Sequence, residues 1–182
     1  TKTPMGARLL REWVVSPLRV STDINYRQIG VKELFENSAL RREFRDILGN
    51  IYDMERISTK VSCARANARD LISLKQSLSK LPALKDKLTF CITDIFVCLE
   101  QQLDVLEEVR ILIGTALVPD PPPAIKDGGL IREGYDASLD ELRYISKNGK
   151  NWIANFQAEE IERTGINSLK VGYNKVFGYY IE

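Results

Sequence analysis

Few residues of this 182-residue sequence have the types and spacing that a chemical site requires. The sequence contains no histidine, which excludes imidazole bases, histidine-activated nucleophiles and histidine-containing metal sites. A phosphate-binding loop of the form G-x-x-x-x-G-K-[ST] is absent, because Asn148-Gly149-Lys150 lacks the first glycine. Glu159, Glu160 and Glu162 lie close in sequence without an acid or base partner, and a solvated helix surface explains them. We therefore expect no active site in this chain.

Side chains suited to binding are instead gathered near residue 170. Five of them could contact the phosphates of a nucleic acid through an ammonium group or hydrogen bonds: Lys170, Lys175, Asn174, Ser168 and Asn167. Gly172 and Gly178 would let a nucleic-acid backbone approach closely. The alternative is that two lysines keep the exposed face of a small sheet soluble and that the glycines mark bulges. The residues alone favour this second interpretation.

These residues lie in segment 165–182. Its successive side chains alternate between two faces with the two-residue period of a β-strand, and the same alternation resumes after a predicted turn. We expect a tight turn at Asn174–Lys175, because asparagine tolerates the positive φ of hairpin loops. We expect the aromatic side chains to form the small core of the sheet rather than to stack on bases. A lone hairpin is marginal in water, so the chain is predicted to be a fragment. One face of each strand should carry Leu169, Val171 and Tyr173, and then Phe177, Tyr179 and Ile181.

A helix of about 28 residues, 136–164, is predicted to precede this β segment. It begins at Asp136 or at Ser138, where Ser138-Leu-Asp-Glu141 fits a capping box, and Gly165 can end it in the left-handed conformation. Gly149 is the weak point, because glycine costs about 1 kcal/mol against alanine inside a helix. The pattern alone leaves a break there open. The apolar residues step by three and four, as in the seam of a helix pair: Leu142, Ile145, Gly149, Trp152 and Phe156.

Residues 1–135 have the periodicity and the short connections of a multihelical bundle. Thr3–Pro4 is a hydroxyl cap followed by proline at the first helical position. Apolar heptads predict one long helix over 90–118, which the proline-rich stretch 119–123 ends. The other helices are expected over about 4–15, 21–37, 40–48 and 51–61, and over 71–81 after a cap at Asn67.

The composition is that of a soluble protein, with 44% hydrophobic and 28% charged residues. No run of 18 apolar residues predicts a membrane span, and the first residues do not have the pattern of a signal peptide. Three cysteines have neither metal spacing nor an even disulfide set, as expected in the cytoplasm. Residues 1–89 carry 17 Lys and Arg against 10 Asp and Glu. The additional Lys and Arg side chains could contact a polyanion, but a helical surface that carries both signs of charge is the commoner explanation of such an excess.

An ordered set of short segments resembles a known family. The segments are MGARLLREW (5–13), DMERI (53–57), RDL (69–71), DGGLI (127–131), GYD (134–136) and TGINSLKVGYNKVFGYYIE (164–182). In this order and at these distances they are similar to the core, lever and clamp of the MutS family of DNA mismatch-recognition ATPases. The resemblance covers essentially the whole chain, and the ordered set is far more specific than any single segment.

The resemblance implies a mainly α fold: a helical core over 1–135, one continuous lever helix over 136–164, and the first strands of an incomplete antiparallel β clamp over 165–182. It implies non-sequence-specific clamping of the duplex backbone and mechanical coupling to a remote ATPase. The implied partners are double-stranded mismatched DNA, a second copy in a homodimer and a MutL-type repair protein, with no membrane.

The family's mismatch-reading Phe-x-Glu and its nucleotide-binding domain have no counterpart in this sequence. The resemblance therefore implies no cofactor here, with ATP and Mg²⁺ held elsewhere in the parent protein, and a cytoplasmic, nucleoid-associated location. The alternative function is a helical protein-interaction module without a DNA role. Salt-dependent duplex binding by the parent protein would distinguish the two hypotheses.

Overall fold

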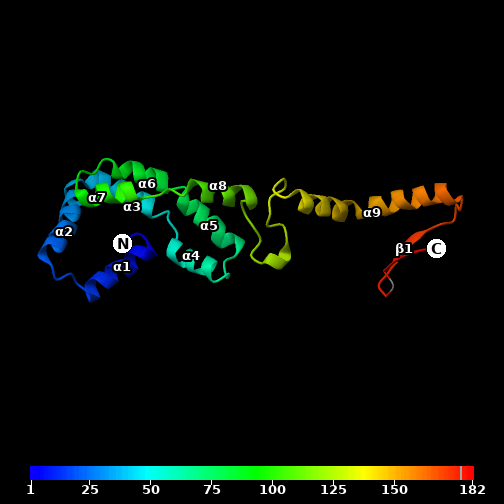
Figure 1. The fold of residues 1–182 in the computed structure, drawn as a ribbon, viewed down its shortest axis with the longest axis horizontal. Helices are drawn as coiled ribbons and strands as arrows, with labels where there is room; N and C mark the ends of the chain where they lie inside the picture. Colours follow the sequence, from blue (N-terminus) through cyan, green and yellow to red (C-terminus); the bar gives the residue numbers. More distant parts are fainter. Residues whose placement is uncertain (177) are drawn as a thin grey trace. The chain divides into compact units, whose positions relative to one another are not determined.

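The structure, a computed structural model, describes residues 1–176 and 178–182, without the side chain of Lys150. It is mainly helical with one small antiparallel sheet, as predicted (Figure 1). The chain forms two compact units, residues 1–132 and 133–182. The first unit holds α1 (Pro4–Val15), α2 (Ser21–Glu36), α3 (Ser38–Leu48), α4 (Met54–Ser62), α5 (Ala68–Leu78), α6 (Leu81–Leu88), α7 (Asp94–Gln102), α8 (Glu107–Ala116) and the short 3-10 helix η1 (Ile125–Asp127). The second unit holds α9 (Ala137–Thr164), β1 (Val171–Asn174) and β2 (Gly178–Ile181).

Local signals place several helix ends of the first unit where the sequence predicts them. The Thr3 hydroxyl accepts a hydrogen bond from the Gly6 amide at 3.0 Å and caps α1. Asn67 and Asp70 form a reciprocal capping box at the start of α5. The helix α2 begins at Ser21 without a side-chain cap, because the preceding residue, Val20, has no capping side chain.

Three apolar clusters form the core of the first unit. One lies between α3 and α6, a second between α5 and α8, and a third gathers side chains from several helices around the end of α5. The buried members are, in turn, Leu40, Phe44, Leu88 and Cys91; Ala68, Ile72, Ile113 and Leu117; and Ile51, Leu78 and Leu81.

The prediction of a single helix over residues 90–118 is wrong. The structure has two helices there, α7 and α8, separated by residues 103–106. Leu106 has φ +50°, a left-handed conformation that an α-helix does not contain. The apolar residues at the heptad spacing do not form one buried seam, because Ile113 is 7% exposed whereas Ile92 is 86% and Leu99 is 47% exposed.

Tertiary contacts explain this break. Leu103 packs against the first apolar cluster, and Val105 packs against the third. In one α-helix these two residues would point to nearly opposite sides. The Lys85 ammonium donates to the Leu103 carbonyl at 2.8 Å, and Asp104 accepts from the Leu106 amide at 2.9 Å. These bonds satisfy backbone groups that the helix would otherwise have paired.

The helix predicted to extend to residue 81 is also divided. It ends at Leu78, and α6 begins at Leu81 with Pro82 in its first turn. Ile51, expected within the fourth helix, lies before α4 and is buried in the third cluster. Ile51, Leu78 and Leu81 are all buried in the third cluster, and they lie at helix ends or, for Ile51, between two helices.

Two of the sequence segments quoted above meet in the first unit. The Arg8 guanidinium on α1 donates to both carboxylate oxygens of Asp53 at 2.7 and 2.8 Å and to Glu55 at 2.7 Å. Asp53 is also the N-cap of α4 and accepts from the Arg56 amide. The hydrogen bonds from Arg8 hold the pKa of Asp53 at about 2, below its ordinary value of 3.8. This contact fixes α1 against the start of α4.

We expect Asp53→Ala to lower the free energy of unfolding by roughly 1–2 kcal/mol near neutral pH, since it removes a helix cap and a surface ion pair. Asp53→Asn, which retains a capping oxygen, should cost less. The pKa of Asp53 is lowered in the folded chain, so its stabilising effect is present above its unfolded pKa and is lost as the pH falls toward about 2. Urea unfolding at several pH values measures both effects, and equal stability of Asp53→Ala and wild type near pH 7 would contradict the assignment.

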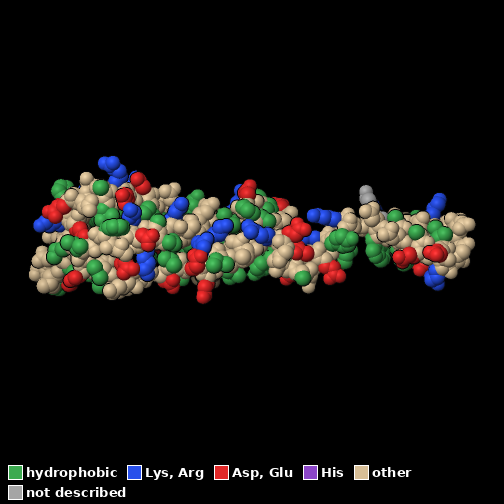
Figure 2. Space-filling view, turned by 90° about the horizontal axis from the view of Figure 1, so that it is seen from above, with side chains coloured by type: hydrophobic (Ala, Val, Ile, Leu, Met, Phe, Trp, Pro, Cys, Tyr) green, Lys and Arg blue, Asp and Glu red, His purple; other side chains and the backbone are tan. Residues whose placement is uncertain are grey.

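The surface of the described residues carries both signs of charge. In the view of Figure 2, Lys and Arg side chains are interspersed with Asp and Glu rather than gathered in one patch. None of the described helices combines the length and the apolar character needed to cross a membrane.

Candidate nucleic-acid interface

The helix α9 supports the predicted binding segment and runs without a break through Gly149. Its cap is Asp136, whose carboxylate accepts from the Leu139 amide at 2.8 Å, so the alternative start at Ser138 is wrong. Trp152 and Phe156, one turn apart, stack with ring centroids 5.4 Å apart. The structure thus decides the question that the sequence pattern left open at Gly149.

The carboxylates near the end of α9 belong to the helix surface. Glu160 accepts a hydrogen bond from Arg163 at 2.6 Å, which lowers the pKa of Glu160 below its ordinary value. Glu159 and Glu162 are exposed. An ionised carboxylate paired with arginine is not poised to act as an acid, which agrees with the interpretation made from the sequence.

Gly165 ends α9 with φ +71°, in the left-handed conformation that the sequence predicts. Residues 167 and 168 then form a turn, and the Leu169 side chain after it is 9% exposed. This short connection leads directly from the helix into the hairpin.

The hairpin pairs β1 with β2 in one antiparallel register. Val171 lies opposite Ile181, and Tyr173 opposite Tyr179. Lys170 and Glu182 exchange two backbone hydrogen bonds, of 2.6 and 2.9 Å, and extend the ladder by one pair. The register places the side chains of Val171 and Tyr173 on the same face of the sheet as those of Tyr179 and Ile181. The grouping within each strand is as predicted. Phe177, predicted for the same face, lies outside the described residues.

The turn of the hairpin differs in detail from the prediction. Asn174 is the last residue of β1, and the turn begins at Lys175. The positive φ in this part of the described chain belongs to Gly178, at +79°, and not to Asn174. The Asn174 side chain instead accepts from the Val176 amide at 2.8 Å. Asparagine thus stabilises the loop by a side-chain hydrogen bond, and glycine supplies the unusual backbone conformation.

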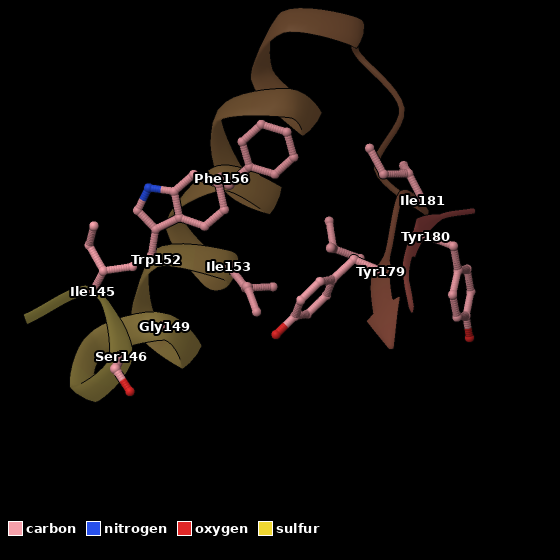
Figure 3. A pocket seen from close by; sticks show the side chains of 10 residues that line it. Ile145, Ser146, Gly149, Trp152, Ile153, Phe156, Tyr179, Tyr180 and Ile181 are labelled. Atoms are coloured by element: carbon pink, nitrogen blue, oxygen red, sulfur yellow. The ribbon is translucent and has the colours of Figure 1, made fainter. Parts of the chain in front are cut away.

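One face of the hairpin is directed toward α9. A half-open apolar cavity of about 600 Å³ lies between them. Val171, Tyr179, Tyr180 and Ile181 line it from the hairpin. Figure 3 shows the Tyr179 ring turned toward α9 and the Tyr180 ring turned away from it. The residues of α9 that line this cavity are Ile145, Ser146, Gly149, Trp152, Ile153 and Phe156.

The other face carries part of the predicted binding set. By strand alternation, Lys170, Gly172 and Asn174 share the face that is turned away from α9. Lys175 lies in the turn, and Asn167 and Ser168 lie in the connection after α9. All five predicted side chains are exposed: Asn167, Ser168, Lys170, Asn174 and Lys175. Neither of the two lysines forms an ion pair with a described residue, so both ammonium groups can meet an external anion.

Two features of the hairpin differ from what the sequence suggests. A Cβ atom at Gly172 would lie 2.7 Å from the Tyr180 ring, so that ring, and not an approaching backbone, occupies the space beside Gly172. The aromatic side chains do not form a closed core, because Tyr173 is 64% and Tyr179 is 66% exposed. Their rings pack edge to face with centroids 5.0 Å apart. The Tyr180 ring lies beside Gly172, and Tyr180 also contributes to the lining of the cavity.

The described part of the chain contains no cluster of three or more Cys, Asp or Glu side chains that could hold a metal ion. The exposed polar side chains of the hairpin and of the preceding connection offer hydrogen-bond donors and two positive charges. This set suits the phosphate groups of a polyanion. The sequence did not indicate the contribution of Gln157, whose side chain accepts from the Val171 amide at 3.1 Å.

Comparison with known proteins gives a consistent result. The sequence profile of the family described as MutS domain III matches residues 1–173. A DNA mismatch repair protein MutS of Acetivibrio thermocellus is 48% identical over 182 residues, covering 100% of this chain and 21% of that protein. The MutS of Methanosarcina barkeri is 46% identical over 187 residues, which cover 100% of this chain and 21% of that protein. The MutS of Halothermothrix orenii is 48% identical over 182 residues, which cover 100% of this chain and 20% of that protein.

The chain thus spans about a fifth of the length of these curated relatives. The profile and the relatives cover the same helices and the start of the hairpin whose geometry is described above. They agree with the resemblance carried by the short segments of the sequence. The chain belongs to the MutS family, and its residues 1–173 match domain III of that family.

Proposed function

We propose that this chain is the part of a DNA mismatch repair protein that holds the backbone of duplex DNA without reading its sequence. The observation that carries the proposal is the exposed face of the hairpin, in a chain that matches MutS domain III. Lys170 and Asn174 lie four residues apart on one face, a span of about 13 Å along a strand. Duplex DNA rises about 3.4 Å per phosphate of one strand, so this face can follow several phosphates.

The second part of the proposal is mechanical coupling through α9. Its 28 residues form one helix from Ala137 to Thr164, which at about 1.5 Å per residue makes a rod of roughly 40 Å. A continuous helix carries displacement along its axis, because every backbone hydrogen bond lies nearly parallel to it. In this proposal a remote ATPase, with its ATP and Mg²⁺, lies in other parts of the protein and acts on the hairpin through α9.

The proposed partners are those of a DNA repair protein. Double-stranded DNA containing a mismatch is the substrate, a second copy of the protein completes a homodimer, and a MutL-type protein is a further partner. The proposed location is the cytoplasm, in association with the nucleoid. The comparisons support this assignment through relatives whose name is DNA mismatch repair protein.

A helical protein-interaction module remains the second candidate. The observation that favours it is the exposed apolar surface of α1 and α2, on which Val14 is 73% and Val31 is 68% exposed. Exposed apolar surfaces of this kind commonly contact other proteins or domains. A protein with this function alone would not bind duplex DNA in a salt-dependent manner.

We expect the double substitution Lys170→Glu and Lys175→Glu in the full-length protein to weaken duplex binding by at least about ten-fold at low salt. The slope of log K against log salt should become shallower by about 1.8 per subunit, because two phosphate contacts are lost. Matched and mismatched duplexes should lose similar affinity, since backbone contacts carry no sequence information. Fluorescence anisotropy titrations over a range of salt concentrations measure all three quantities.

The matched control is Lys80→Glu with Lys126→Glu, which changes the net charge equally at two exposed lysines of the first unit. The control should keep the slope of the wild type. If both double variants change binding equally, a general charge effect explains the result and the hairpin is not the contact surface. If neither variant changes binding, the two hairpin lysines do not contribute to DNA binding.

A further inference from the structure

We propose that Gln157 is a positioning residue that holds the hairpin in the orientation required to present Lys170 and Asn174. Its side-chain carbonyl accepts a hydrogen bond from the Val171 amide at 3.1 Å. Among the described residues, this is the hydrogen bond that joins α9 to a strand of the hairpin. The functional part of the inference rests on the proposed function, whereas the structural part can be tested without DNA.

The position of the Val171 amide leaves it without a partner in the strand ladder. Lys170 and Glu182 exchange both backbone hydrogen bonds, so the next pair, Val171 and Ile181, is a non-hydrogen-bonded pair of the antiparallel ladder. The Val171 N–H therefore points to the outer edge of β1, away from β2. Val171 is half-buried, and a half-buried amide without a partner is unfavourable. The Gln157 carbonyl supplies that partner from α9.

The apolar contacts alone do not specify the orientation of the hairpin. Ile153 and Phe156 of α9 line the cavity together with Val171 and Ile181 of the hairpin, and apolar contacts of this type are not directional. A shift of β1 by one residue would exchange its two faces and turn Lys170 toward α9. A hydrogen bond is directional, so the contact from Gln157 selects the residue of β1 that lies opposite this position of the helix.

The structural test measures hydrogen exchange at single amides of the full-length protein by fragmentation mass spectrometry. In Gln157→Leu, which keeps a side chain of similar size without the acceptor, the Val171 amide should exchange about five-fold faster or more. The Gly172 amide, which belongs to the ladder with Tyr180, should keep its protection and show that the hairpin remains folded. Gln157→Glu retains an acceptor oxygen and should restore the protection of Val171.

The functional test measures duplex affinity of the same variants. Gln157→Leu should bind about five-fold more weakly with an unchanged salt slope, because the lysines are present but less often correctly oriented. Gln101→Leu, at an exposed glutamine of α7, is the control and should bind as the wild type does. Unchanged exchange at Val171 in Gln157→Leu would overturn the inference. Faster exchange with unchanged affinity, in a protein whose lysine-to-glutamate variant does lose affinity, would overturn its functional part.

The outcomes also separate this inference from the proposed function. If the lysine-to-glutamate variant binds DNA as tightly as the wild type, the hairpin is not the DNA contact and the proposed function fails. The exchange of Val171 in Gln157→Leu does not depend on that result. Faster exchange there would still establish that Gln157 positions β1.

Discussion

Replacing Gly149 by proline in the full-length protein is expected to disrupt α9 and to weaken the response of duplex binding to ATP. Gly149 lies near the middle of this helix. Proline at an interior position removes a backbone hydrogen bond and clashes with the preceding turn, at a cost of about 3 kcal/mol or more. Hydrogen exchange over residues 145–153 should accelerate. The change in duplex affinity on adding ATP should become smaller, because the proposed path for motion is interrupted.

The matched control is Gly149→Ala. A Cβ atom at this position has no described heavy atom within 4 Å. Alanine should therefore stabilise the helix by about 1 kcal/mol and leave the ATP response intact. If the proline and alanine variants respond to ATP alike, coupling does not pass through a continuous α9. If exchange over 145–153 is slow in the proline variant, the helix tolerates the substitution and the energetic argument is wrong.

Leu78→Ala is expected to destabilise the first unit by about 3 kcal/mol. Leu78 is 2% exposed and lies in the third apolar cluster with Ile51 and Leu81. Met5 of α1, Met54 of α4 and other partly buried side chains pack against this cluster. Truncation would leave a cavity where several helices meet, and the lost contacts add to the lost transfer free energy. Urea unfolding of the chain, followed by circular dichroism, measures the change.

Leu112→Ala is the control for this prediction. Leu112 is on α8 and is 56% exposed. The same chemical change there should alter the free energy of unfolding by no more than about 0.5 kcal/mol. Similar losses for the two variants would mean that the third cluster does not dominate the stability of the first unit.

The sequence alone determined those parts of the structure that depend on neighbouring residues. Thr3 and Asn67 were identifiable as helix caps, and Gly165 as a left-handed helix end, because each acts on backbone groups within a few positions. The faces of the hairpin followed from the two-residue period of a strand.

The tertiary structure decided whatever depends on residues distant in sequence. The break between α7 and α8 arises because Leu103 and Val105 pack into different clusters, and the heptad pattern does not contain that information. The pairing of Arg8 with Asp53 and the hydrogen bond from Val171 to Gln157 likewise join residues that only folding brings together. Periodicity records which side of an element is apolar. It does not record which neighbour covers that side, because the choice depends on the summed packing of many side chains.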